Sequence, residues 1–193
     1  MKKLYVIVGR TCSGKDTLAK KMCGYLGFRQ AITYTNRKKR DDETEGVEHY
    51  FVTTDKIQDM IYKDKRADNP TVFSPTHIGR NYYCTTYNEI KKSDIIILDT
   101  KGVLDVIHDK NIKRDLEIVY LNTSKEDREE RSRLFRSDHK NFQNRCEKEN
   151  INFNHFERYF ERHNYKKLNK HNKKIKYIVL APNEIDGYIS SIK

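Results

Sequence analysis

The sequence predicts an α/β fold in which a five-stranded parallel sheet is flanked by helices. Short apolar runs recur along the 193 residues, and helical patterns separate them. No internal repeat or flexible linker interrupts this alternation, and the length suits one domain with a substantial core. Strands that alternate with helices in this way form a parallel sheet joined by right-handed crossovers.

Buried strands are expected at five runs that are short and either apolar or β-branched, as in a sheet covered on both faces. They are residues 4–8 (LYVIV), 31–35 (AITYT), 94–99 (DIIILD), 116–121 (LEIVYL) and 176–181 (KYIVLA). The first run stops abruptly at Gly9, where a loop begins.

Helical patterns lie between these runs. After the first run, Leu18, Met22 and Leu26 recur at i, i+4 and i+8, and Gly27 stands where a helix would end. Further helices are expected after Thr54, over residues 125–136 and over residues 140–162. An insertion, residues 37–86, is too long for a simple crossover, so we expect a small subdomain there.

The net charge and the cysteine pattern restrict the classes of function that are expected for this chain. The formal net charge of +11 suits nucleic-acid binding, an enzyme that handles several phosphate groups, or a lysine-rich surface, and charge alone does not decide among them. The densest basic run, residues 165–176, is interpreted as exposed surface. The four cysteines are scattered without a C-x-x-C pair, and no apolar run is long enough to cross a bilayer. We therefore expect a cytoplasmic protein without a membrane partner.

Residues 9–15 (GRTCSGK) fit the phosphate-loop pattern G-x-x-x-x-G-K, placed after a strand and before a helix. Glycines allow backbone N–H groups to turn inward as an anion nest, and the helix N-terminus adds partial positive charge. Lys15 is then expected to reach the outer phosphates of ATP, as in the P-loop NTPase fold. The residues predicted to bind ATP here are Gly9, Ser13, Gly14, Lys15, Asp16 and Thr17. The alternative is a glycine-containing turn with an incidental lysine.

Asp16 departs from this pattern, because a Ser or Thr hydroxyl usually follows the lysine and ligates magnesium. A carboxylate can still bind Mg²⁺ directly or through water, and Asp also suits the first turn of a helix. Thr17 supplies a hydroxyl one residue later. Asp16 and Thr17 are therefore the predicted magnesium ligands.

A second motif lies in the insertion. Residues 32–57 resemble the monophosphate-binding segment of the guanylate kinase family, which shows T-x-R-x-x-R-x-x-E-x-x-G, an acidic residue, aromatics and F-V. The matching residues are Thr35, Arg37, Arg40, Glu43, Gly46, Glu48, Tyr50, Phe51 and Val52. The family's N-Y-Y-G-[ST] element appears as residues 81–85 (NYYCT). The resemblance implies one domain with a monophosphate-binding subdomain at 37–86, a helical lid at 124–163 and a core of residues 1–36, 87–123 and 164–193.

Arginine chemistry supports this interpretation independently, since a guanidinium fork matches the oxygens of a monophosphate. By resemblance, Arg37, Arg40 and Tyr83 hold the acceptor phosphate. Glu43 is expected to orient the two arginines. The remaining predicted substrate contacts are Thr33, either His49 or Tyr50, Thr85 and Asp99. The alternative is a solvated run of charges in a basic protein.

Base recognition is where this chain departs from the family. Guanine is read there by a Glu at a position that falls near Ser74 here, and by a hydroxyl, for which Thr33 is expected. No Asp or Glu occurs between Asp68 and Glu89. Neither Ser nor His reproduces the hydrogen-bond pattern of a buried carboxylate. We therefore expect GMP to be a poor substrate or one that is not uniquely preferred, whereas the resemblance by itself implies GMP or dGMP as the acceptor.

Arginines follow the fourth strand in the expected lid, where cationic charge would stabilise the transferring phosphoryl group. The family's lid arginines are best matched by Arg136 and Arg145, with Arg131 next. Arg128 and Arg133 are interpreted as part of an exposed helix face. Asn183, after the last strand, is expected near the adenine.

Together these features predict a nucleoside monophosphate kinase that transfers the ATP γ-phosphate to a nucleoside or deoxynucleoside monophosphate with magnesium. Its expected partners are therefore small-molecule nucleotides. A non-catalytic interaction module of the same family would be expected to lose Lys15, Arg37 and Arg40, which this chain retains. A kinase of nucleic-acid ends would make use of the charge of +11, and binding to oligonucleotides would distinguish it.

Overall fold

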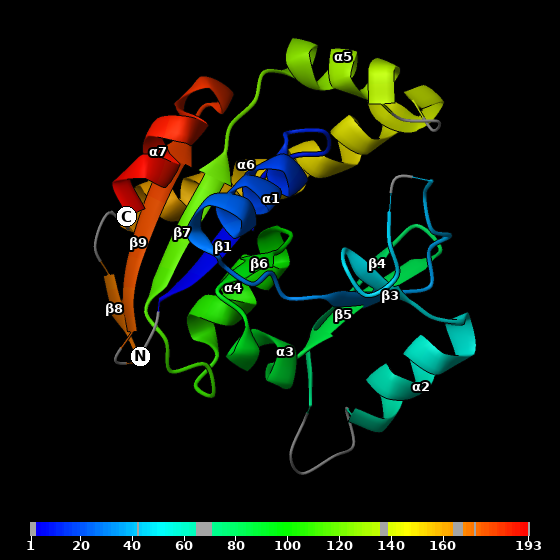
Figure 1. Cartoon of the computed structure of the whole chain (residues 1–193). Coiled ribbons are helices and arrows are strands. Elements are labelled where there is room, and N and C mark those ends of the chain that lie inside the picture. The colour runs from blue at the N-terminus through cyan, green and yellow to red at the C-terminus, as the bar shows by residue number, and fades with distance from the viewer. Residues whose placement is uncertain are drawn as a thin grey trace. The chain divides into compact units, whose positions relative to one another are not determined.

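The computed structural model divides into two compact units, most of whose elements are labelled in Figure 1. The described residues are 3–41, 43–64, 71–135, 139–163, 168–171 and 173–192. The first unit comprises Met1–Phe28 and Ile97–Lys193, and the second comprises Arg29–Ile96. Within the described residues, no helix has both the length and the apolar character needed to cross a bilayer.

The larger sheet has the strand order β6-β1-β7-β9-β8. Its strands are β1 (Leu4–Val8), β6 (Ile95–Ile97), β7 (Leu116–Leu121), β8 (Leu168–Lys170) and β9 (Lys173–Leu180). β1 pairs in parallel with β7, and β7 with β9, whereas β8 runs antiparallel to β9. β1 and β7 are buried at every residue, as expected for strands that are covered on both faces.

One predicted strand lies outside this sheet. The run at 31–35 forms β2 (Thr33–Thr35), which pairs with strands of the second unit. Thr33 and Tyr34 are only partly buried, so the run lacks the burial of a central parallel strand. The fifth strand is instead β8, a short antiparallel strand at the sheet edge. The prediction of five parallel strands was therefore wrong, because residues 31–35 belong to the smaller sheet and β8 is antiparallel. The α/β class with a parallel sheet is confirmed.

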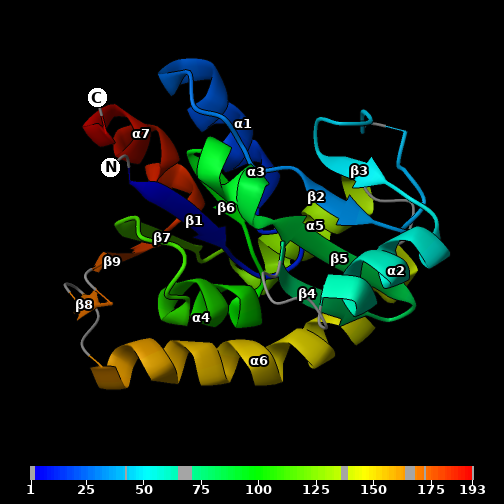
Figure 2. The same cartoon turned by 90° about the horizontal axis from the view of Figure 1, so that it is seen from below.

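The first unit carries helices on both faces of the larger sheet. They are α1 (Lys15–Leu26), α4 (Thr100–His108), α5 (Lys125–Phe135), α6 (Phe142–His163) and α7 (Ile185–Ile192), with 3₁₀ turns at His139–Asn141 and Pro182–Glu184. Figure 2 shows α1 and α7 on one face and α4 and α6 on the other. α1 ends where predicted, since Gly27 has a φ of 66° and its N–H donates to the Cys23 carbonyl. α5 and α6 confirm two further predicted helices to within a few residues, whereas α4 and α7 were not predicted.

The second unit is built on a smaller sheet with the strand order β3-β2-β5-β4. Besides β2, its strands are β3 (His49–Phe51), β4 (Val72–Ile78) and β5 (Asn81–Thr86), and its helices are α2 (Thr54–Asp64) and α3 (Tyr87–Lys92). α2 packs on one face, where Ile57 and Ile61 join Val72 and Cys84 in a buried cluster. Because side chains along a strand alternate between faces, Tyr83 lies on the face away from α2.

A bulge interrupts β4 where it pairs with β5. The register passes from Phe73 opposite Thr85 to Thr76 opposite Tyr83, and Ser74 has a φ of 43° between them. An extra residue of this kind changes which later side chains share a face with the partner strand. Thr76, and not Ser74, is therefore the β4 residue opposite Tyr83.

Candidate functional site

Glycine is required at two positions of the loop formed by residues 9–15. A side chain at Gly9 would bring its Cβ within 2.8 Å of the Leu121 carbonyl oxygen, and Gly14 has a φ of 97°, which strongly favours glycine. Lys15 follows as the first residue of α1. This succession of strand, loop and helix is the arrangement that places backbone N–H groups and a helix N-terminus around an anion.

Lys15 lies against its own loop. Its Nζ donates to the carbonyl oxygen of Gly9 at 2.7 Å and to that of Arg10 at 2.8 Å. These bonds hold the ammonium group at the loop, and the side chain is only partly exposed. A charged donor in this position is suited to meet phosphate oxygens that enter the loop.

Ser13 carries a hydroxyl that is buried without a partner. The residue is 1% exposed, and its Oγ is the one buried side-chain polar atom of the described residues that makes no hydrogen bond. Buried polar groups are nearly always paired, because an unmade hydrogen bond costs about 1–3 kcal/mol. The Ser13 hydroxyl therefore fits a site whose ligand supplies the missing partner.

Asp16 and Thr17 occupy the first turn of α1, and both are exposed. In the part of the chain that the structure describes, no three His, Cys, Asp or Glu side chains gather as a metal site. Magnesium that accompanies a nucleotide takes one or two protein ligands and completes its shell with phosphate oxygens and water. Asp16 and Thr17 fit that partial role, because both offer oxygen donors beside the loop.

The predicted lid arginines have different surroundings. Arg131 on α5 donates from Nη1 to the Ser13 carbonyl at 3.0 Å, so it contacts the phosphate loop directly. Arg145 is partly buried on α6, and Arg133 is exposed, as expected. Arg136 lies outside the described residues.

Arg128 is buried, contrary to the sequence interpretation. The residue is 4% exposed, and its guanidinium donates to the Thr123 carbonyl at 3.3 Å and to the Thr11 carbonyl at 3.5 Å. The interpretation of Arg128 as part of a solvated face was wrong, because α5 turns this residue toward the loop. The spacing from Arg131 was the available signal, since residues three apart share a helix face.

Two other predicted residues lie at the ends of elements. Asp99 caps α4, where its Oδ1 accepts from the Gly102 N–H at 2.7 Å. This capping role by itself explains why an Asp stands at position 99, whether or not the side chain also contacts a ligand. Asn183 is exposed in the 3₁₀ turn that follows β9. Their contacts with nucleotides stay predictions.

In the second unit, Glu43 joins the two predicted acceptor arginines. Its carboxylate accepts from Arg37 Nη2 at 2.7 Å and Nη1 at 2.9 Å, and from the Arg40 backbone N–H at 2.8 Å. Burial alone would raise the pKa of Glu43, but the hydrogen bonds and charges of the two arginines outweigh burial and lower it to about 2. An ionised, nearly buried carboxylate thus holds two arginines side by side.

One face of the smaller sheet gathers several other predicted residues. Thr33 Oγ1 lies 2.6 Å from His49 Nδ1, and the His49 and Tyr83 ring centroids are 6.2 Å apart. The Arg37 guanidinium lies 5.6 Å from the centroid of the Phe51 ring, which alternation along β3 places on the same side as His49. This face therefore presents a hydroxyl, an imidazole, a phenol and a guanidinium together.

Tyr50 and Thr85 have other contacts. The Tyr50 ring lies 4.8 Å from that of Tyr34, which packs against the buried cluster under α2. Of the two alternatives left open by the sequence, the structure brings His49 to the face described above, and not Tyr50. Thr85 is buried, and its Oγ1 donates to the Ile32 carbonyl at 3.1 Å.

The base-reading position predicted near Ser74 falls in the β4 bulge. No Asp or Glu stands on β4, and the residue opposite Tyr83 is Thr76. The next acidic residue, Glu89, is 8% exposed and accepts from Arg29 Nη2 at 3.1 Å. This part of the described chain therefore offers no carboxylate at the predicted position.

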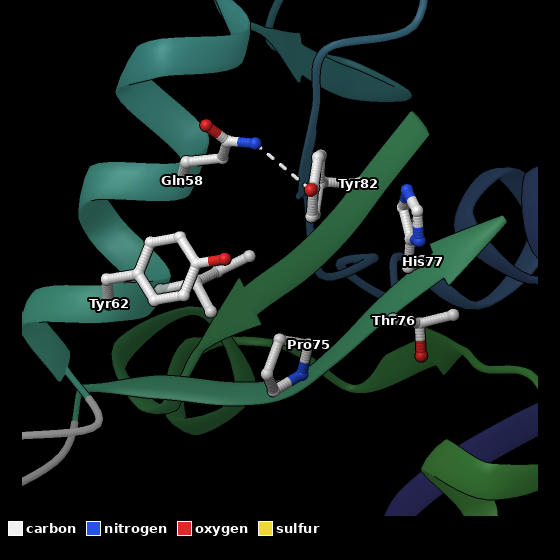
Figure 3. Close-up of a pocket in the computed structure, with 7 residues that line it drawn as sticks. Gln58, Tyr62, Pro75, Thr76, His77 and Tyr82 are labelled. Carbon is white, nitrogen blue, oxygen red and sulfur yellow. Dashed lines mark hydrogen bonds between the residues drawn. The ribbon is translucent and has the colours of Figure 1, made fainter. Parts of the chain in front are cut away.

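A pocket of about 140 Å³ lies on the α2 side of the smaller sheet (Figure 3). Gln58 Nε2 donates to the Tyr82 hydroxyl at 3.0 Å, and the His77 ring stacks on Tyr82 with centroids 4.5 Å apart. None of the described residues that line it was predicted as a site residue. The pocket and the face that carries Tyr83 are thus different surfaces of the second unit.

Most of the predicted site residues therefore gather in two clusters, one in each unit. The first unit holds Gly9, Ser13, Gly14, Lys15, Asp16, Thr17 and Arg131 at the loop. The second holds Arg37, Arg40 and Glu43, with Thr33, His49 and Tyr83 on the sheet face. A glycine loop before a helix and a pair of guanidinium groups are both devices that bind phosphate.

Comparisons with known proteins point to the same chemistry. A family model described as "Guanylate kinase" matches residues 1–181. The guanylate kinase of Fusobacterium nucleatum is 31% identical over 137 residues, which cover 67% of this chain and 69% of that protein. The guanylate kinase of Schizosaccharomyces pombe is 30% identical over 109 residues, which cover 54% of this chain and 52% of that protein.

A solved structure shares the fold. The crystal structure of guanylate kinase from Anaplasma phagocytophilum aligns with 99% of this chain and 82% of that chain, with a TM-score of 0.62. The sequence identity is 15%, so this likeness bears on the fold alone.

Proposed function

The chain belongs to the guanylate kinase family, and we propose that it is an ATP-dependent nucleoside monophosphate kinase. The observation that carries this proposal is the arginine pair of Arg37 and Arg40, joined by the carboxylate of Glu43. A protein that only hydrolyses ATP needs one phosphate-binding device. A kinase with a phosphorylated acceptor needs a second, and these arginines supply it in addition to the loop at residues 9–15.

The donor in this proposal is ATP. Backbone N–H groups of the loop and the N-terminus of α1 face its phosphate oxygens, and Lys15 neutralises part of their charge. The buried Ser13 hydroxyl gains a phosphate oxygen as its partner, which removes the cost of leaving it unpaired. Asp16 and Thr17 would hold magnesium, and the ion would supply charge neutralisation to the phosphates. Asn183 is the proposed contact of the adenine.

The acceptor monophosphate is held in the second unit. Arg40 directs its guanidinium to the phosphate oxygens, and Tyr83 adds a hydroxyl. Arg37, whose fork is paired with Glu43, adds positive charge beside them. His49 contributes an imidazole from the same sheet face as Tyr83. Glu43 is already bonded to both arginines, so its role is to orient them and not to contact the ligand.

Phosphoryl transfer joins these two ligands. An oxygen of the acceptor phosphate attacks the γ-phosphorus of ATP, the bond from that phosphorus to the β–γ bridging oxygen breaks, and ADP and a nucleoside diphosphate form. Negative charge moves toward the bridging oxygen during this step, so fixed cations lower the barrier. Arg131, Arg136 and Arg145 are the proposed cations, and Arg131 already contacts the loop at Ser13.

Base selection differs from the family pattern. Guanine carries an N1–H and a 2-amino group, and both need an acceptor in a closed site. β4 offers Thr76 opposite Tyr83 where the family pattern requires a carboxylate nearby. The proposed acceptor is therefore a purine ribo- or deoxyribonucleoside monophosphate, with GMP or dGMP accepted but not exclusively preferred.

An assay of ADP formation over the common nucleoside and deoxynucleoside monophosphates tests this function. We expect ATP-dependent turnover with at least one purine monophosphate and none with oligonucleotides that carry a 5′-hydroxyl. A protein that is inactive toward every monophosphate would instead be a non-catalytic interaction module. Phosphorylation of the oligonucleotides would favour a kinase of nucleic-acid ends.

A further inference from the structure

Helix α6 presents one row of side chains to the phosphate loop. Cys146, Glu149, Phe153 and Glu157 are spaced by three or four residues, so they share one face of α6. Each contacts residue 10 or 11 of the loop, either directly or through one arginine of α5. Sequence reasoning placed this helix in the lid and found no role for its carboxylates.

Arg10 is held by three side chains. Its Nη1 donates to Glu157 Oε1 at 2.8 Å and contacts the Tyr120 hydroxyl, which itself donates to Glu157 Oε1 at 2.5 Å. The guanidinium also lies 4.6 Å from the centroid of the Phe153 ring, a cation–π contact. Because the Arg10 side chain is only 15% exposed, water screens these interactions little.

Thr11 is held on both sides of its backbone. Its N–H donates to Glu149 Oε2 at 2.8 Å, and its carbonyl accepts from Arg128 Nη1 at 3.5 Å. Arg128 Nη1 in turn lies 3.5 Å from Cys146 Sγ on α6. Rotation of the backbone at Thr11 would therefore break a hydrogen bond to α5 or α6.

Glu157 is ionised in this setting. Burial would raise the pKa of Glu157, but hydrogen bonds from Arg10 and Tyr120 outweigh burial and place it below its ordinary value. Burial raises the pKa of Tyr120, so its phenol donates as a neutral hydroxyl. An ionised carboxylate accepts stronger hydrogen bonds than the amide of a Gln. Glu157→Gln therefore keeps the shape of the side chain and weakens its hold on Arg10.

We propose that Glu149 and Glu157 are positioning residues that fix the phosphate loop through Thr11 and Arg10. Residues 10 and 11 lead directly into the part of the loop that forms the anion nest. Fixing them from α6 keeps the following N–H groups turned inward before a ligand arrives. Such preorganisation raises affinity, because the cost of ordering the loop is met in advance. The inference rests on the proposed function in one respect, the naming of ATP as the ligand of the loop.

Hydrogen exchange and ATP binding test the proposal in the full chain. Glu157→Gln and Glu149→Gln are compared with Glu147→Gln, which removes the same charge from an exposed position of α6. Without nucleotide, the amides of residues 10–15 are expected to exchange about fivefold faster in the first two variants and at the wild-type rate in the control. The Kd for ATP is expected to rise about tenfold in the first two, with the KM for the acceptor within about twofold of wild type.

The outcomes separate positioning from packing. Glu157→Asp retains the charge and is expected to recover part of the ATP affinity, a rescue that a packing role would not give. If Glu157→Gln does not fold, Tyr120→Phe takes its place, because it removes one hydrogen bond to the same carboxylate and should also speed exchange of the loop.

The positioning role is overturned if the folded Glu157→Gln and Glu149→Gln variants exchange the amides of residues 10–15 at the wild-type rate and bind ATP with the wild-type Kd. A wild-type protein that binds no ATP would refute the proposed function instead. The exchange comparison would still decide whether α6 orders the loop, because it is made without nucleotide.

Discussion

Arg37 and Glu43 form a bidentate pair, in which Nη2 donates to Oε1 at 2.7 Å and Nη1 donates to Oε2 at 2.9 Å. Two parallel hydrogen bonds fix the plane of the guanidinium as well as its position. The same carboxylate accepts the backbone N–H of Arg40, so it also fixes the turn that carries the second arginine. A phosphate that binds here meets donors that are already oriented, and this lowers the ordering cost of binding.

Glu43→Gln is expected to destabilise the protein in a pH-dependent way. At neutral pH the free energy of unfolding should fall by about 2 kcal/mol, because Arg37 and Arg40 lose an ionised acceptor. The pKa of Glu43 is lowered from 4.5 to about 2 by folding. A carboxylate with a depressed pKa stabilises the fold fully above its unfolded value, and this stabilisation is lost as the pH falls through its folded value.

Urea unfolding of wild type and Glu43→Gln at several pH values measures this effect. The difference between the two proteins should shrink as the pH falls from 4.5 toward 2. Asp41→Asn, at an exposed position two residues away, is the matched control and should follow the wild type. A difference that does not change with pH would contradict the assignment of the effect to the Glu43 charge.

Lys15→Ala is expected to abolish most of the activity and leave the fold intact. The ammonium lies at the loop carbonyls of Gly9 and Arg10, where the phosphates of the donor are proposed to enter. Loss of this charge should cost about 3–4 kcal/mol of transition-state stabilisation, seen as a fall in kcat/KM for ATP. Lys20→Ala removes an exposed charge from the same helix and serves as the control. Near wild-type turnover of Lys15→Ala would rule out the kinase proposal.

Arg40→Met is expected to impair use of the acceptor monophosphate without impairing the binding of ATP. The KM for the monophosphate should rise and kcat should fall, because a charged fork directed at the acceptor phosphate is lost. The Kd for ATP should change little. Lys38→Met, at an exposed position of the same segment, controls for the loss of one positive charge. An equal loss of ATP binding in Arg40→Met would show that this arginine serves the donor.

Lys173→Met is expected to destabilise the first unit. Lys173 is 1% exposed, so the interpretation of residues 165–176 as exposed surface was wrong at this position. Its Nζ donates to the carbonyl oxygens of Val106 at 2.8 Å and Asp109 at 2.6 Å. These acceptors lie at the end of α4, where a cation satisfies unpaired carbonyls and opposes the helix dipole. Loss of the ammonium should lower the free energy of unfolding by about 2–3 kcal/mol, measured in urea. Lys174→Met, at the exposed neighbour, should have a much smaller effect, and similar losses in both would argue against the cap.

The substrate panel is expected to show no exclusive preference for GMP. Two donors of guanine would lack a carboxylate acceptor, and each unpaired donor costs about 1–3 kcal/mol in a closed site. Another purine or deoxynucleoside monophosphate should therefore reach a kcat/KM within about tenfold of that for GMP. A strong and exclusive preference for GMP would mean that Glu48, Glu43 or a backbone carbonyl reads the base.

The sequence by itself determined the features that depend on local geometry. Gly9 and Gly14 are needed because a Cβ would clash with the Leu121 carbonyl at one position and a φ of 97° disfavours side chains at the other. Both requirements belong to a short segment, so a spacing pattern reveals them. The grouping of Arg37 and Arg40 with Glu43 could also be predicted from the sequence, because Glu43 lies three residues from Arg40 and six from Arg37.

Only the tertiary structure decided the features that depend on packing between distant segments. His49 and Tyr50 are adjacent in the chain, and the pairing of Thr33 with His49 determines which of them shares a face with Tyr83. Arg10 and Glu157 meet across 147 positions, and no local pattern marks a loop arginine as the partner of a helix that far away. Periodicity shows which residues can share a face of one element. Which element covers that face depends on how the whole chain packs.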